Sequence, residues 1–119
     1  MSPEKLQVIK VKIRLGLLPS CPEYNLNQPD QLQEYLGIAL RWAAIHGHLD
    51  TVKYLVSLGC DPRANDDLAI RWAIRNGHLD TVKYLVSIGC NIHADDDYAF
   101  KWAVRNGHTD VYNYLKSLN

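Results

Sequence analysis

Three histidines recur along the chain at intervals of 30 residues, at positions His48, His78 and His108. Imidazole is a common metal ligand, so evenly spaced histidines first suggest a metal site. If each histidine belongs to one unit of a stack, however, neighbouring rings lie about one helix-packing distance apart, roughly 10 Å. Because a zinc–nitrogen bond is only about 2 Å long, no two of these rings could share an ion, and a structural role is expected. His46 and His93 are expected on the surface.

Acidic runs form a second candidate site for cations. Asn65-Asp66-Asp67 and Asp95-Asp96-Asp97 could be imagined as calcium loops, but they lack the glycine and the distant glutamate that such loops use. The sequence instead indicates helix starts, where Asp66 or Asp67 caps the free amides of a first turn.

Tryptophans recur at the same interval, at Trp42, Trp72 and Trp102. Indole rings in a row could stack a ligand, although packing between neighbouring units is the commoner use of so large a ring. The sequence contains no Ser–His–acid set, no glycine-rich phosphate loop and no paired carboxylates in apolar surroundings. We therefore expect a protein that is not an enzyme and that uses no metal, cofactor or small-molecule substrate.

Composition narrows the class of protein. The 119 residues are 47% hydrophobic and 22% charged, as in soluble globular proteins. Thirteen basic residues balance thirteen acidic ones, which disfavours a general binder of nucleic acid or of anionic membranes. The apolar runs are too short to span a bilayer, and segment 1–18 lacks the uninterrupted apolar core of a signal peptide.

The three cysteines, Cys21, Cys60 and Cys90, are an odd number without close pairs. This spacing suits neither a disulfide framework nor a zinc site. Cys60 and Cys90 each follow a glycine, so we expect both to be small buried apolar side chains. Free thiols favour a reducing compartment, and the expected location is the cytoplasm or the nucleus.

The even spacing of these residues comes from an internal repeat. Residues 38–67 and 68–97 are identical at 20 of 30 positions, and residues 98–119 match residues 68–89 at 11 of 22. Such self-similarity is typical of stacked structural repeats. Apolar residues at three- and four-residue spacing, followed by glycine, predict two helices per copy. The expected bounds are 67–76 and 79–88 in one copy and 97–106 and 109–118 in the next, with almost no strand.

The repeats divide the chain into four parts: segment 1–37, a repeat at 38–67, a repeat at 68–97 and a truncated repeat at 98–119. Residues 6–16 align with residues 49–59, so segment 1–37 is interpreted as a degenerate capping half-repeat followed by a proline-containing loop. In this cap we expect Lys10, Lys12 and Arg14 to face solvent. We also expect Asp30 to cap a short helix over 31–35 and Gly37 to break it. No helix pair could bury its apolar face alone, so neighbouring copies must complete each other's core.

The repeat resembles the ankyrin repeat. Residues 68–94, LAIRWAIRNGHLDTVKYLVSIGCNIHA, follow the order of that family's pattern, with Gly77-His78 and Gly89 at matching places. The family's histidine, which ties the loop to the first helix, is replaced by Arg41, Arg71 and Lys101 in the three copies. The period is 30 residues rather than the usual value of about 33, and the missing residues fall at the β-hairpin finger. The resemblance implies an all-α, ankyrin-type solenoid of stacked antiparallel helix pairs with shortened β-hairpin fingers.

Short-period repeats that contain RWA, with second helices like VKYLVSLG, are also similar to those of ankyrin proteins from giant DNA viruses of amoebae (mimivirus-like). This likeness implies a viral protein that binds host proteins in the host cytoplasm.

Ankyrin proteins bind protein partners on a concave face, and the resemblance implies the same of this chain, as a monomer. The residues that map to this face are Arg41, Ile45, His46, Arg71, Arg75, Asn76, Lys101, Arg105 and Asn106, with Arg63, Asp66, Asp95 and Asp96 at the loop tips. Because Ile45 stands where later copies have Arg75 and Arg105, we hypothesise that these arginines serve a partner rather than the stack. Two alternatives stay open: a nucleic-acid-associated protein that uses the basic row on the first helices, and a structural spacer without a specific partner.

Overall fold

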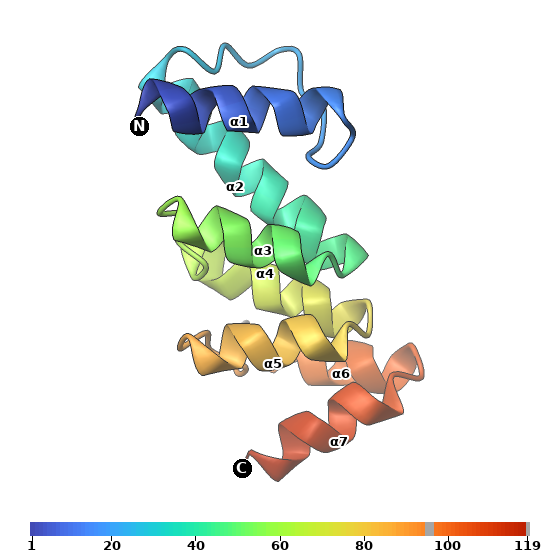
Figure 1. Cartoon of the computed structure of the whole chain (residues 1–119). Coiled ribbons are helices and arrows are strands. Elements are labelled where there is room, and N and C mark those ends of the chain that lie inside the picture. Colours follow the sequence, from blue (N-terminus) through green and yellow to red (C-terminus); the bar gives the residue numbers. More distant parts are fainter. Residues whose placement is uncertain (95–96, 119) are drawn as a thin grey trace.

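The computed structural model describes residues 1–94 and 97–118, and these residues form seven α-helices and no strand (Figure 1). The helices are α1 (Pro3–Arg14), α2 (Pro29–His46), α3 (Leu49–Ser57), α4 (Ala64–Arg75), α5 (Leu79–Ser87), α6 (Tyr98–Arg105) and α7 (Thr109–Ser117). They stack into an elongated body with extents of 43 × 23 × 23 Å. The predicted all-α solenoid is therefore confirmed, and the bounds of α4 to α7 lie within three residues of the expected ones.

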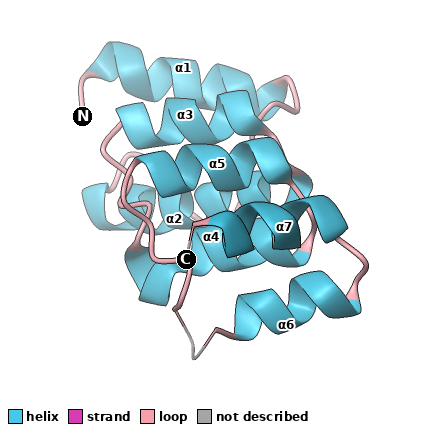
Figure 2. Cartoon of the chain, turned by 90° about the horizontal axis from the view of Figure 1, so that it is seen from below, coloured by secondary structure: helices cyan, strands magenta, loops and turns pink. Residues whose placement is uncertain are grey.

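The helices are arranged in two layers (Figure 2). The first helices of the repeats, α2, α4 and α6, pack on one another in one layer, while α1, α3, α5 and α7 form the other. Each repeat places apolar side chains between the layers, and in the second repeat Ile70, Ile74, Val82 and Leu85 are all fully buried. Stacking on both sides therefore supplies the apolar surroundings that one helix pair lacks.

The helix α1 is a second helix without a first helix of its own. Its Ile9 is fully buried, and the ammonium of Lys12 lies 4.4 Å from the ring centroid of Tyr54 on α3. Lys10 donates a hydrogen bond to Asn27 Oδ1 at 2.8 Å, in the loop that follows α1. Both lysines are thus half-buried, and only Arg14 faces solvent as expected. The long lysine stems cover apolar surface that a complete repeat would enclose.

Helix α2 is longer than the sequence analysis predicted. It begins at Pro29, with Asp30 in its first turn making no capping bond, and it continues through Gly37 without a break. Leu36 and Leu40 are buried one turn apart on either side of the glycine, and their burial outweighs its helix cost of about 1 kcal/mol. The predicted break at Gly37 is therefore wrong. Because α2 crosses the boundary between 37 and 38, the division of the chain at that point stays a prediction.

A left-handed turn stands in place of the expected finger in the second repeat. Asn65, Asp66 and Asp67 all have positive φ, between 56° and 59°, which asparagine and aspartate tolerate better than other side chains. Arg71 holds this turn, since its Nε donates to the carbonyl oxygen of Asp66 at 3.0 Å and its Nη2 to that of Asn65 at 3.1 Å. Arg71 thus makes the loop-to-helix tie for which the family uses histidine.

Neither Asp66 nor Asp67 caps α4, and Asp97 does not cap α6. Asp67 is buried, and its carboxylate accepts from Arg63 Nε at 3.2 Å and from the backbone amide of Asn91 at 3.0 Å. Asp97 has a positive φ, pairs with His93 and makes no capping bond to α6. The predicted capping is therefore wrong, because these carboxylates hold the turns together instead. Asp95 and Asp96 lie outside the described residues.

The histidine row packs each repeat onto the one before it. Nε2 of His78 lies 2.7 Å from the carbonyl oxygen of Ile45. Because a carbonyl oxygen only accepts, the proton of this hydrogen bond is on Nε2 of the histidine. A Cβ added at Gly47 would overlap the His78 ring, and one at Gly77 would overlap His108. The structural role expected of these two histidines is therefore confirmed.

The described residues contain neither a cluster of metal ligands nor a candidate membrane span. In residues 1–94 and 97–118, no three His, Cys, Asp or Glu side chains gather as metal ligands could. Within the same ranges, no helix is both long and apolar enough to cross a membrane.

The buried thiols make stability sensitive to high pH. All three cysteines are free, and burial raises the pKa of Cys60 and Cys90 to about 11 from an ordinary 9.0. The unfolded chain then loses its thiol protons first, so we expect the free energy of unfolding to fall as pH rises from 9.0 to about 11. Urea unfolding across this range should show a shallower decline for the Cys60→Ala/Cys90→Ala variant. Equal slopes for the two proteins would contradict the assignment.

The second and third repeats should differ in how much a side-chain truncation at the same position destabilises the fold. Ile74 is fully buried between repeats, whereas Val104, its counterpart in the third repeat, is 59% exposed. Ile74→Ala should lower the free energy of unfolding by about 2–5 kcal/mol because it opens a cavity. Val104→Ala should stay within about 0.5 kcal/mol. Urea unfolding of both variants tests this difference, and similar midpoints would argue against it.

Candidate functional site

The outward side of α2, α4 and α6, here called the first-helix face, concentrates cations and aromatic rings. Its residues are Arg41, Trp42, His46, Arg71, Trp72, Arg75, Tyr98, Lys101, Trp102 and Arg105. Most of them recur at equivalent places of successive repeats, so helix stacking aligns them in rows. This face therefore offers positive charge beside partly exposed π surfaces.

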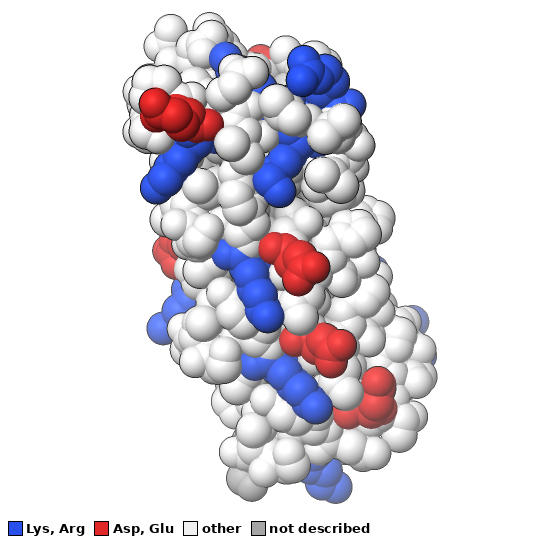
Figure 3. Space-filling view, in the orientation of Figure 1, with Lys and Arg blue, Asp and Glu red and all other residues white. Residues whose placement is uncertain are grey.

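The opposite layer has a different character. Figure 3 views the side of α1, α3, α5 and α7, where basic and acidic side chains alternate down the stack. Lys53 lies 5.6 Å from the ring centroid of Tyr84, and Lys83 lies 5.5 Å from that of Tyr114. Each lysine thus reaches the next helix of its own layer.

Arg75 occupies the centre of the first-helix face. Its guanidinium carbon lies 4.8 Å from the ring centroid of Trp72 and 4.1 Å from that of Trp102 in the next repeat. Such contacts are attractive because the ring face is electron-rich. Arg75 therefore belongs to the stack, contrary to the hypothesis that it serves only a partner. Arg105 is exposed, and its guanidinium carbon lies 5.4 Å from the ring centroid of Trp102.

Other residues assigned to the face also bond within the chain. Asn76 donates through Nδ2 to the carbonyl oxygen of Trp72 at 2.8 Å, at the end of α4. Asn106 donates through Nδ2 to the carbonyl oxygen of Arg75 at 3.1 Å, which links the second and third repeats. These asparagines fix the ends of the first helices, and their part in binding stays a prediction.

In the first repeat, imidazoles rather than arginines contact the tryptophan ring. Trp42 lies 5.4 Å from the ring of His46 and 5.0 Å from that of His48, measured between centroids. Ile45 is half-buried at the position of Arg75, and its carbonyl oxygen accepts from His78. Arg41 and Lys101 are both exposed, so the basic row continues at its two ends.

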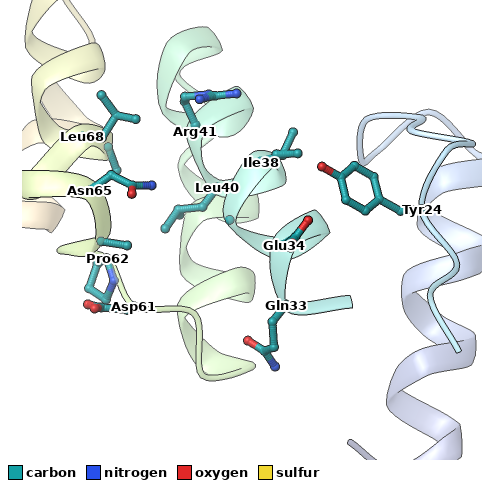
Figure 4. A pocket seen from close by; sticks show the side chains of 13 residues that line it. Tyr24, Gln33, Glu34, Ile38, Leu40, Arg41, Asp61, Pro62, Asn65 and Leu68 are labelled. Carbon is teal, nitrogen blue, oxygen red and sulfur yellow. The ribbon is translucent and has the colours of Figure 1, made fainter. Parts of the chain in front are cut away.

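Two hollows open beside this face. The larger, of about 380 Å³, lies between α2 and the turn at 61–65, with Tyr24 reaching it from the loop before α2 (Figure 4). The smaller, of about 100 Å³, lies between α4 and α6. Its lining residues are Leu68, Arg71, Trp72, Arg75, Tyr98, Ala99 and Trp102.

The sequence analysis missed Tyr24 and Tyr98. Tyr24 belongs to a loop that was interpreted as a connector without a site. Tyr98 stands where the second repeat has Leu68, and an aromatic residue at that repeat position was the signal that could have revealed it. In the structure Tyr98 is 47% exposed and lies 5.9 Å from Trp102, between ring centroids.

Arg75 and Arg105 provide a matched pair for testing the stack contact. Arg75→Ala removes contacts with two indole rings, so we expect the free energy of unfolding to fall by about 1 kcal/mol. Arg105→Ala, at an exposed site, should change it by less than about 0.5 kcal/mol. Urea unfolding measures both. If the two variants were equally stable, Arg75 would contribute nothing that Arg105 does not.

Comparison with known proteins agrees with this architecture. The family model described as "Ankyrin repeats (3 copies)" matches residues 16–96 and 40–119. The structure of an ankyrin repeat family protein from Legionella pneumophila aligns with a TM-score of 0.64 and 32% identity, over 74% of this chain and 29% of that one. The chain thus spans less than a third of that protein. No curated protein matches it. With helix pairs, glycine–histidine contacts and this match over most of its length, the chain belongs to the ankyrin-repeat family.

Proposed function

We propose that the chain is a non-enzymatic protein–protein interaction module and that the first-helix face is its binding surface. Ankyrin repeats are a general protein–protein interaction module, which supports the class of function. The observation that carries the choice of face is the alignment of Arg75, Trp72 and Trp102, partly exposed between two repeats. Arginine and tryptophan are the residues most enriched among interface hot spots.

The placement of cations in rows favours the same face. On the second-helix side, Lys53 and Lys83 lie over the rings of Tyr84 and Tyr114 on the next helix of that layer. On the first-helix face, Arg41, Lys101 and Arg105 are exposed cations in equivalent or neighbouring positions. Aligned cations steer an acidic partner segment during encounter and disfavour wrong partners.

The biological setting belongs to the same proposal. The 30-residue repeats resemble those of giant DNA viruses of amoebae, so we place the protein among viral factors that bind host proteins. Its three free cysteines suit the reducing cytoplasm or nucleus of a host cell. In this proposal the chain acts as a monomer.

Charge reversal on each layer separates the two faces. The variant Lys101→Glu/Arg105→Glu changes the first-helix face, and the variant Lys53→Glu/Lys83→Glu makes the same net change on the other. We expect the first variant to lose at least tenfold in affinity for a protein captured from amoebal lysate, since two interface cations become repulsive. The second should stay within about threefold, because charges outside an interface act only through a screened field. Calorimetry with the captured protein measures both.

The opposite ranking of these variants would move the binding surface to the second-helix layer. Capture of no protein, together with salt-dependent shifts of RNA or DNA, would favour the nucleic-acid alternative. Neither protein nor nucleic acid bound would leave the structural spacer.

A further inference from the structure

We propose that the small pocket between α4 and α6, here called the Arg75 pocket, binds the carboxylate of an acidic side chain on the partner. Its defining residues are Leu68, Trp72, Arg75, Tyr98 and Trp102. The proposal rests on the proposed function and specifies the chemistry of the partner: a segment with Asp or Glu beside an apolar residue.

The guanidinium of Arg75 is held but not neutralised. Its contacts at 4.8 Å and 4.1 Å are with the rings of Trp72 and Trp102, which leave its N–H edge without an acceptor. Among residues 1–94 and 97–118, the guanidinium makes no hydrogen bond or ion pair, although the backbone carbonyl oxygen of Arg75 accepts from Asn106 Nδ2. A guanidinium is a planar fork of donors that matches a carboxylate with two parallel bonds. Because the rings already restrict its rotamers, less entropy is lost when that carboxylate binds.

The remaining walls fit an apolar neighbour of the acidic residue. Leu68, Ala99 and Tyr98 line the pocket, and Tyr98 is 47% exposed. A volume of about 100 Å³ admits the end of one side chain and no more. The apolar residue next to the acid then packs against Tyr98 and the exposed part of Trp102.

The charges around the pocket favour an anion with a single charge. Lys101 and Arg105 are exposed on α6 and add attraction, whereas Asp97 on the same side is paired with His93. Arg71 also lines the pocket, but its Nε and Nη2 donate to backbone carbonyl oxygens of the turn. A phosphate group carries nearly two charges and typically recruits several arginines, so a pocket whose lining offers the guanidinium of Arg75 suits a carboxylate better.

The pocket is specific to one junction of the described stack. At the junction of α2 with α4, Ile45 takes the place of Arg75, and an aliphatic side chain offers no donor. The partner's acidic residue is therefore expected to bind between the second and third repeats.

Three blocked peptides test the chemistry directly. The probes are acetyl-Leu-Glu-Leu-amide, its neutral isostere acetyl-Leu-Gln-Leu-amide and acetyl-Leu-phosphoserine-Leu-amide, titrated into the full, isotope-labelled chain. We expect the Glu peptide to shift the indole N–H signals of Trp72 and Trp102 saturably, and to bind at least fivefold more tightly than the Gln peptide. The phosphoserine peptide should bind no more tightly than the Glu peptide.

Two lysine variants test the residue. Arg75→Lys keeps the charge but loses the fork, so it should weaken binding of the Glu peptide at least fivefold. Arg14→Lys, a control at an exposed arginine of α1 outside the first-helix face, should change it less than twofold. Urea unfolding of both variants, with their indole signals, verifies that the fold is kept.

Equal binding of the Glu and Gln peptides, or an unchanged affinity in Arg75→Lys, would overturn the proposal. So would phosphoserine binding more than tenfold tighter than Glu, which would assign the pocket to phosphorylated segments. These outcomes are distinct from a failure of the proposed function. If the captured protein still depends on Lys101 and Arg105 while the Glu peptide fails, the face binds a partner but not through this carboxylate.

Discussion

Ile74 and Val104 occupy the same place in successive repeats, yet the first is fully buried and the second is 59% exposed. The difference comes from a neighbour: α4 has a first helix on both sides, whereas α6 has one on a single side in the described stack. Burial of one aliphatic side chain contributes about 1.5–3 kcal/mol, so completing each other's apolar face is the interaction on which the whole chain depends. The glycine–histidine contacts follow from it, since Gly47 leaves room for the ring of His78 only if repeats lie at one fixed spacing.

That fixed spacing also decides what the outward side can do. Side chains at equivalent positions are brought into rows, and two rings from different repeats can then flank one cation, as Trp72 and Trp102 flank Arg75. The short turn contributes as well. A left-handed path through Asn65–Asp67 saves residues but needs support, and Arg71 supplies it by donating to two backbone carbonyl oxygens. Arg71 therefore uses its donors to stabilise the turn, whereas the guanidinium of Arg75 keeps N–H groups for a ligand.

The sequence predicted the features that depend on local pattern. Helix bounds followed from apolar spacing and glycine stops, and the role of His78 followed from its place in the repeat. Features that depend on three-dimensional neighbours were not predictable. Gly37 favours a helix end by itself, but buried Leu36 and Leu40 carry α2 through it. Three consecutive positive φ angles could not be inferred from an acidic run that also suits capping. The contact of Arg75 with Trp102 joins residues in different repeats, and a repeat pattern gives their spacing but not the direction of their side chains.

The position of Arg75 couples binding to the stability of the stack. Its two rings belong to the second and third repeats, so any group that holds the guanidinium also holds the junction of α4 with α6. A ligand that binds only the folded chain stabilises it in proportion to its affinity and concentration. In a repeat array this stabilisation acts first on the adjoining interfaces, because each repeat contacts only its neighbours. The third repeat has one such interface in the described stack, made by α6 on α4 and α7 on α5. Occupation of the Arg75 pocket therefore stabilises the interface between the second and third repeats. Arg75 thus contributes both to partner binding and to the stacking of these two repeats.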